Sequence, residues 1–258
     1  MFVHGLWLHS TSWKVWIDLF AEAGYAPLAP EWPGIPSSIR EARTGAAGSG
    51  KAGVTAVTEH FARIIADLPV PPILIGHSFG GLIVQKLLGA GHGAAAVAID
   101  PAPMKRVLAL PPSALKVASI ALRNPLNFSR LVGISREEFR YGFGNALPEE
   151  ESAALFEAWT IPTPGRPLFE AATANLSPSS ATAVATANPD RGPLLLVSGG
   201  RDRTVPPAMV HGARKRYRSS PPVTELVEFP DRGHSLVIDH GWREVAEAAL
   251  AFLKRHGL

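Results

Sequence analysis

The chain has 258 residues, of which 46% are hydrophobic and 18% charged, and a formal net charge of +3, which indicates a globular α/β domain with an insertion. Because it has no cysteine, no polybasic tail and no aromatic-basic motif, the composition excludes disulfides, thiol catalysis and thiolate metal sites and predicts no nucleic-acid partner. No apolar run approaches the roughly 18 residues of a membrane span, and the N-terminal MFVHGLWLHS lacks a signal-peptide pattern, so we expect a cytoplasmic protein.

Short apolar runs alternate with longer segments of helical period along much of the chain. The short runs predict strands at residues 2–3, 26–29, 72–75, 94–99, 194–198 and 223–229. The longer segments predict helices at residues 13–23, 54–68, 79–90, 207–217 and 242–256. This alternation favours an α/β fold with a mainly parallel sheet of about six strands and helices on both faces.

The glycine-rich segment TGAAGSGKAG, residues 44–53, matches two phosphate-binding patterns by its spacing. Gly48, Gly50 and Gly53 fit G-x-G-x-x-G, and residues 45–51 fit the start of G-x-x-x-x-G-K. A dinucleotide fingerprint directly follows a strand, whereas the preceding PGIPSSIREAR is no buried strand, and Ala52 stands where a phosphate loop needs Ser or Thr. We therefore interpret the segment as a loop and expect no cofactor.

One serine, Ser78, lies in a G-x-S-x-G pattern within PPILIGHSFGGLIV. An apolar run ends at Gly76 and a helical segment starts at Phe79, which is the strand-turn-helix context of a nucleophile elbow. Gly80 allows the strand and the helix to approach closely, and the helix N-terminus directs free N–H groups toward whatever Ser78 attacks. The sequence therefore predicts a nucleophile; the alternative is a serine that only caps the helix.

Residues 101–191 form a stretch with no convincing strand. We interpret it as a helical insertion after the fourth strand of the sheet, which leaves residues 1–100 and 192–258 as the core domain. Helical stretches rich in Ala and Leu, separated by prolines, occupy residues 113–122, 136–143 and 149–159.

A nucleophilic serine needs a base to take its proton, and the base needs a carboxylate to hold its tautomer. The loops after parallel strands converge at one edge of the sheet. Asp202 follows the run PLLLVSGG, and His234 follows the run TELVEFP, so both are candidates. Asp100, at the end of VAID, is a rival acid on the same edge; Asp202 is favoured because Pro101 fits a turn into the insertion.

Four motifs taken in order resemble those of α/β-hydrolase-fold proteins. FVHGLW is similar to the family's His-Gly oxyanion segment, GHSFGG to its nucleophile elbow, SGGRDRTVP to its acid loop and DRGHSL to its histidine loop. The resemblance implies the catalytic residues Ser78, Asp202 and His234, in that chain order. It also implies an oxyanion hole formed by backbone N–H groups of Leu6 and Phe79, and a cap formed by the insertion. The absence of an opening antiparallel hairpin is similar to the methylesterase and hydroxynitrile-lyase branch.

These residues predict hydrolysis of a small-molecule carboxylic ester or lactone, with an apolar acyl or alcohol portion, through an acyl-enzyme. Trp7, beside the oxyanion segment, and Trp159, in the insertion, are predicted to reach the pocket. The histidines form no H-E-x-x-H or comparable cluster, so no metal is expected.

Two other functions stay open at this point. One is a different reaction on the same triad, either cofactor-free perhydrolysis, as in haloperoxidases, or cyanohydrin cleavage. A hydroxynitrile lyase would carry a lysine near the histidine loop, and DRGHSLVID has none. The other is a receptor that keeps the triad and scarcely turns over.

Overall fold

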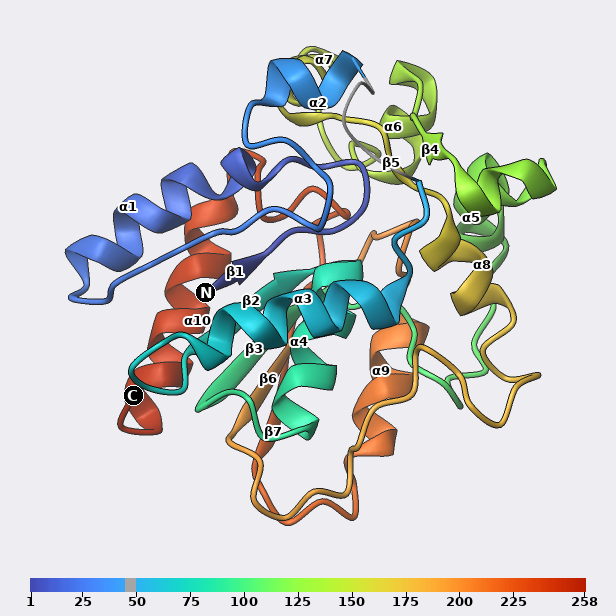
Figure 1. Ribbon diagram of the computed structural model, residues 1–258. Helices are drawn as coiled ribbons and strands as arrows, with labels where there is room; N and C mark the ends of the chain where they lie inside the picture. The colour runs from blue at the N-terminus through green and yellow to red at the C-terminus, as the bar shows by residue number, and fades with distance from the viewer. Residues whose placement is uncertain (45–49) are drawn as a thin grey trace.

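Five parallel strands form the central sheet of the computed structural model, which describes residues 1–44 and 50–258 (Figure 1). Their order is β1-β2-β3-β6-β7, so the chain starts near one edge, and the segment between β3 and β6 leaves the sheet and returns beside β3. The strands are β1 (Phe2–Val3), β2 (Ile73–His77), β3 (Ala95–Ile99), β6 (Leu194–Gly199) and β7 (Thr224–Phe229).

The predicted strand at residues 26–29 does not form, so the described sheet has five strands where about six were expected. This segment runs beside β1 and shares one hydrogen bond with it, from the Phe2 N–H to the Leu28 carbonyl at 2.8 Å. Because β1 is only two residues long, it has few backbone N–H and C=O groups with which a neighbouring strand could pair. The other predicted strands are confirmed, within a residue or two of their ends.

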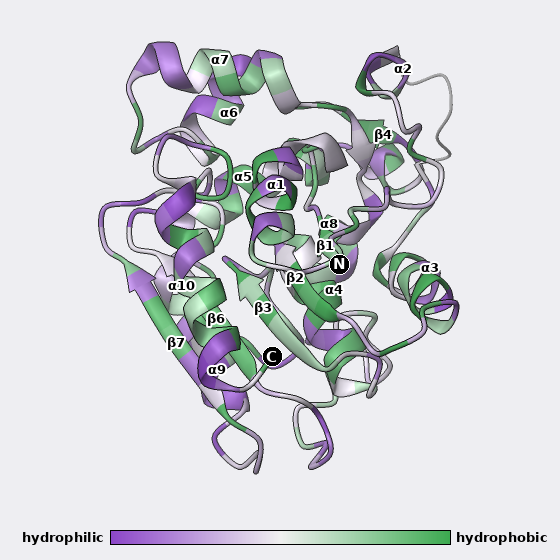
Figure 2. Cartoon of the chain, turned by 90° about the vertical axis from the view of Figure 1, so that its left-hand side faces the viewer, coloured by the Kyte–Doolittle hydropathy of each residue, from purple (hydrophilic) through white to green (hydrophobic). Residues whose placement is uncertain are grey.

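Side chains on alternate residues of each strand enter separate cores on the two faces of the sheet. In β3, Ala96 and Ala98 face one core, whereas Ala95, Val97 and Ile99 face the other. Figure 2 shows β3 as hydrophobic between helices that have both hydrophobic and hydrophilic residues. One face is covered by α3 (Val54–Ala66), α4 (Phe79–Gly89) and α9 (Pro207–Arg216), and the other by α1 (Lys14–Glu22) and α10 (Trp242–Arg255).

The predicted core helices are confirmed; α4 is buried on nearly all sides, whereas the others bury one apolar stripe. In α10 the buried residues are Val245, Ala246, Ala249, Phe252 and Leu253, which recur at helical spacing. The first predicted helix, 13–23, begins as a 3₁₀ turn, η1 (Ser10–Trp13), before α1. Within the described residues, no helix combines the length and the apolar character needed to cross a membrane.

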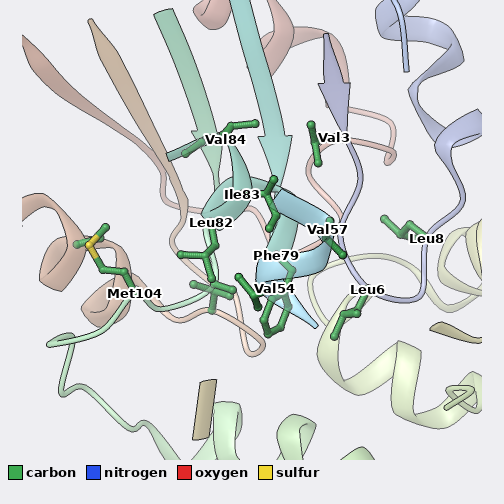
Figure 3. Packing of buried hydrophobic residues seen from close by; sticks show 14 of the residues in the cluster. Val3, Leu6, Leu8, Val54, Val57, Phe79, Leu82, Ile83, Val84 and Met104 are labelled. Atoms are coloured by element: carbon green, nitrogen blue, oxygen red, sulfur yellow. The ribbon is translucent and has the colours of Figure 1, made fainter. Parts of the chain in front are cut away.

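The helix α4 lies directly against β1 and β2, which positions its N-terminus at the C-terminal ends of these strands. A side chain on Gly80 would collide with the Val3 carbonyl oxygen, and one on Gly76 would collide with the Gly80 carbonyl. Leu82 and Ile83 of α4 are fully buried in the same core as Val54 and the other labelled residues of Figure 3. Burial of each such aliphatic side chain stabilises the fold by about 1.5–3 kcal/mol. This packing fixes α4 and, with it, the turn at its N-terminus.

The segment between β3 and β6 contributes most of the structure beyond the C-terminal ends of the strands (Figure 1). Its three predicted helices are confirmed as α5, α6 and α7. A short helix, α8, and a two-stranded antiparallel pair were not predicted. The elements are α5 (Pro112–Leu122), η2 (Pro125–Ser129), β4 (Leu131–Val132), α6 (Arg136–Gly142), α7 (Glu149–Trp159), β5 (Thr163–Pro164) and α8 (Arg166–Ala172).

The glycine-rich segment is only partly described, because residues 45–49 lie outside the described residues. It is preceded by a short helix that was not predicted, α2 (Ile39–Thr44), and followed by α3. The first amide of α3, on Val54, donates a hydrogen bond of 2.7 Å to the Glu170 carboxylate. A protein carboxylate therefore already occupies the position at this helix N-terminus where a phosphate would bind.

Candidate active site

Ser78 occupies a strained turn between β2 and α4, with φ 57° and ψ −121°. A residue other than glycine in such a conformation costs about 1–3 kcal/mol and persists only where its surroundings hold it. Here the Ser78 N–H donates to the Ile99 carbonyl at 2.9 Å, and its carbonyl accepts from Leu82 at 3.2 Å and from Ala102 at 2.9 Å. The turn is thus held by β3, by α4 and by the loop that follows β3.

Asp202 and His234 meet beyond the ends of β6 and β7, as their positions after these strands predicted. His234 Nδ1 lies 2.5 Å from Asp202 Oδ2, and both side chains are buried. The other carboxylate oxygen, Oδ1, accepts from the amides of Thr204 at 2.6 Å and Val205 at 2.8 Å, which orients the carboxylate. Among the described residues, His234 Nε2 has no hydrogen-bond partner, so this nitrogen is free to accept a proton.

His77, the residue directly before Ser78, holds the histidine loop. Its Nε2–H donates to the His234 carbonyl at 2.9 Å, and the two rings are 4.5 Å apart between centroids. Phe143 contacts the His234 ring edge-on at 4.7 Å. Burial, followed by the nearby His234, lowers the pKa of His77 well below its usual range, so His77 is neutral and keeps one N–H to donate. The adjacency to Ser78 was the only signal in the sequence.

Asp100, the rival acid, is also brought to the site and is fully buried. Its Oδ1 accepts from the Gly199 amide at 2.7 Å, and its Oδ2 lies 3.9 Å from His234 Nδ1. Asp202 therefore lies within hydrogen-bond distance of His234 Nδ1, whereas Asp100 Oδ2 lies beyond it. In the described part of the chain, His77, Asp100 and His234 are the one group whose atoms are spaced as metal ligands, within 4.8 Å of one another.

The N-terminal segment packs directly against the nucleophile elbow. A β-carbon on Gly5 would lie 2.7 Å from Ser78 Cβ, so only glycine permits this approach. The amides of Leu6 and Phe79 donate to no protein acceptor among the described residues, and both residues line the same cavity as Ser78. The arrangement can present two N–H groups to a ligand atom beside Ser78.

Buried polar residues, His4 among them, pack behind this segment. His4 Nε2 lies 3.3 Å from both the Trp32 amide and Glu31 Oε2, and its carbonyl accepts from Trp32 Nε1 at 3.0 Å. Burial raises the pKa of Glu31, but hydrogen bonds from His4 and Ser10 and the nearby imidazoles together lower it by more, so the net shift is downward. Glu31 is therefore a carboxylate that ties the segment to the loop after residue 30.

A cavity of about 100 Å³ opens beside Ser78 under α5 and α8. Its lining is apolar apart from Ser78 and Thr204, and it contains no charged side chain. Two wider and more polar surface clefts, of about 530 and 560 Å³, do not include Ser78. Side chains from the segment between β3 and β6 and from α9 that form the cavity wall include Ala114, Leu115, Ala118, Leu168, Ala171 and Met209.

The two tryptophans predicted to reach the pocket are placed differently. Trp7 lines the cavity, with φ 65°, and its indole N–H donates to the Val132 carbonyl at 3.1 Å. Trp159 is not among the lining residues; it is half-buried at the end of α7, where its carbonyl accepts from the His9 amide at 3.1 Å. Trp159 thus joins α7 to the N-terminal segment.

Comparisons with known proteins give one family match. The model of a family described as the alpha/beta hydrolase family matches residues 1–248. No curated protein matches the sequence.

Several solved structures share the fold over nearly the whole chain. A monoacylglycerol lipase of Paleococcus ferrophilus has a TM-score of 0.69 and 23% identity, over 99% of this chain and 93% of that one. An extracellular α/β-hydrolase from a Paenibacillus species has a TM-score of 0.69 and 19% identity, over 97% of each chain. A methylesterase from Arabidopsis has a TM-score of 0.63 and 16% identity, over 98% of each chain. At these identities the likeness shows the fold.

Proposed function

The chain belongs to the alpha/beta hydrolase family, and on that premise we propose that it is a serine hydrolase of carboxylic esters or lactones with a small to medium apolar portion. The observation that carries the proposal is Ser78 in a strained turn on the wall of an apolar cavity, directly after His77, whose ring donates to the backbone of His234 in the buried His234–Asp202 pair. In this proposal residues 1–100 and 192–258 form the catalytic core, and residues 101–191 form a cap over it.

The reaction begins with attack of Ser78 Oγ on the ester carbonyl carbon, while His234 Nε2 takes the hydroxyl proton. Asp202 accepts from His234 Nδ1–H, which holds the tautomer and balances the charge of the imidazolium. The tetrahedral oxygen lies between the amides of Leu6 and Phe79. Removal of one such donor typically costs roughly 10²–10³ in turnover.

Collapse of this intermediate breaks the bond to the alcohol oxygen, which receives the proton from His234 and leaves Ser78 acylated. Water then attacks the acyl carbon, again with His234 as the base, and a second collapse returns Ser78 as a hydroxyl and frees the acid. In a lactone the alcohol stays attached to the acyl group, so the product is a hydroxy acid.

The substrate class is inferred from the cavity wall. Since its polar side chains are the hydroxyls of Ser78 and Thr204 and no cation lines it, the wall fits an uncharged hydrocarbon group better than a carboxylate or a phosphate. The names of the similar structures, a monoacylglycerol lipase and a methylesterase, belong to enzymes of esters and support the same choice.

A graded series of p-nitrophenyl esters, with lactones alongside, tests the proposal. We expect Ser78→Ala to lose roughly 10³-fold or more in kcat while its circular dichroism stays unchanged. An alkyl phosphonate should label Ser78 alone, as read by peptide mass spectrometry. Ser119→Ala, on the exposed side of α5, is the control and should retain full activity and labelling. Ester hydrolysis that survives in Ser78→Ala would refute the proposal.

A further inference from the structure

Two carboxyl groups, not one, converge on the ring nitrogen of His234 that faces the protein interior. Asp202 Oδ2 lies 2.5 Å from His234 Nδ1, and Asp100 Oδ2 lies 3.9 Å from the same atom. The relative exposure of Asp100 is 0% and that of Asp202 is 4%. The proposed reaction uses one carboxylate, so the second acid needs its own explanation.

The backbone around Asp100 directs its side chain toward this position. Asp100 has φ 40°, which is strained for a residue other than glycine. Its amide donates to the Val197 carbonyl at 2.9 Å, and its Oδ1 accepts from the Gly199 amide at 2.7 Å. Within the described residues, Oδ2 accepts no hydrogen bond. One oxygen is therefore anchored to β6, and the other points at the site with nothing to accept.

The charges that face Asp100 oppose a second negative charge. The ionisable groups around it are Asp202, His234, His77 and Glu228, and none of the described lysines or arginines forms an ion pair with it. His77 is neutral for the reason given above. Burial first, and then the charge of Asp202 and a hydrogen bond with its side chain, raise the pKa of Asp100 well above its usual value.

Building on the proposed serine mechanism, we propose that Asp100 is a positioning residue that keeps its proton at neutral pH and donates it, through Oδ2–H, to the carboxylate of Asp202. The carboxylate of Asp202 then accepts from the amides of Thr204 and Val205, from His234 and from Asp100. One negative charge, spread over several donors, faces the imidazole. Asp100 thereby limits how strongly the site stabilises the protonated form of His234.

Two substitutions distinguish a protonated Asp100, which donates a hydrogen bond, from an ionised Asp100, which adds a second negative charge. Asp100→Asn keeps a hydrogen-bond donor of the same shape. In the plot of kcat/KM against pH, the midpoint of the acidic limb should therefore be the same as in the parent. Asp100→Ala removes the donor, leaves Asp202 more negative, and should raise that midpoint by roughly 0.5–1 pH unit, the equivalent of one hydrogen bond. If Asp100 were ionised, both variants would remove a negative charge and lower the midpoint, which would overturn the proposal.

Infrared spectroscopy provides a readout that needs no turnover and no Ala variant. The parent protein at neutral pH should show the carbonyl stretch of a protonated carboxyl group, and Asp100→Asn should lose it. Asp231→Asn, which removes an acid that is 77% exposed, is the control and should keep the band. Absence of the band from the parent would refute the proposal about Asp100. Absence of ester hydrolysis with the band present would instead count against the proposed function.

Discussion

Filling the cavity beside Ser78 should shorten the acyl chain that the enzyme prefers. Ala118 lies on α5, lines the cavity and is half-buried, so a larger side chain there projects into the space of about 100 Å³. Ala118→Leu adds an isopropyl group, roughly three methylene equivalents, which at about 0.8 kcal/mol each amounts to about 2.4 kcal/mol. Since about 1.36 kcal/mol is a factor of ten in rate, kcat/KM should fall by up to roughly 60-fold for a chain that needs this room.

The assay is kcat/KM for p-nitrophenyl esters from acetate upward. In the parent, each added methylene should raise kcat/KM by roughly fourfold until the cavity is full, after which the values should decline. In Ala118→Leu, acetate should change little and longer chains should lose most. Ser119→Leu places the same group one residue along α5, on the exposed side, and should leave the profile as in the parent. Parallel profiles for the two variants would show that the acyl chain does not enter this cavity.

Three further predictions follow from the site and its supports. Asp202→Asn should lower kcat by up to roughly 10⁴-fold by allowing the wrong imidazole tautomer, and Asp100→Asn should cost far less; the reverse ranking would make Asp100 the acid. Trp159→Ala should lower Tm and leave the chain-length profile unchanged, because Trp159 is not among the residues that line the cavity; a shifted optimum would contradict this placement. Because the pKa of Glu31 is lowered from its usual value of 4.5, its ionised form stabilises the folded state at pH values above 4.5. This contribution is lost as the pH falls through the folded-state pKa. Glu31→Gln should therefore lower Tm at neutral pH by a margin that closes below about pH 4.5, and a margin independent of pH would refute the role of its charge.

Much of the backbone around Ser78 could be predicted because it depends on local sequence. The apolar runs identify five of the six predicted strands, since a strand buried on both faces needs an apolar residue at nearly every position. Gly76 and Gly80 indicate the close approach of β2, α4 and β1, because no larger residue fits there. The positions of Asp202 and His234 after β6 and β7 place them at one sheet edge, as parallel topology requires.

Other features of the site arise from contacts between residues far apart in the chain. Sequence alone left Asp100 as a rival to Asp202, and only the fold places their oxygens 3.9 and 2.5 Å from the same imidazole nitrogen. Glu31 carried no motif, and its partnership with His4 appears only when the loop after residue 30 packs beneath the N-terminal segment.

The segment between β3 and β6 was the least predictable part, for a physical reason. Helical periodicity in α5 and α7 indicates that each helix has a face to bury, but it does not specify the surface against which that face packs. Trp7 and Trp159 were therefore equivalent candidates in the sequence. The tertiary structure separates them, because hydrogen bonds to Thr163 and Val132 hold Trp7 at the cavity wall, whereas the end of α7 is held elsewhere by the hydrogen bond from His9 to Trp159.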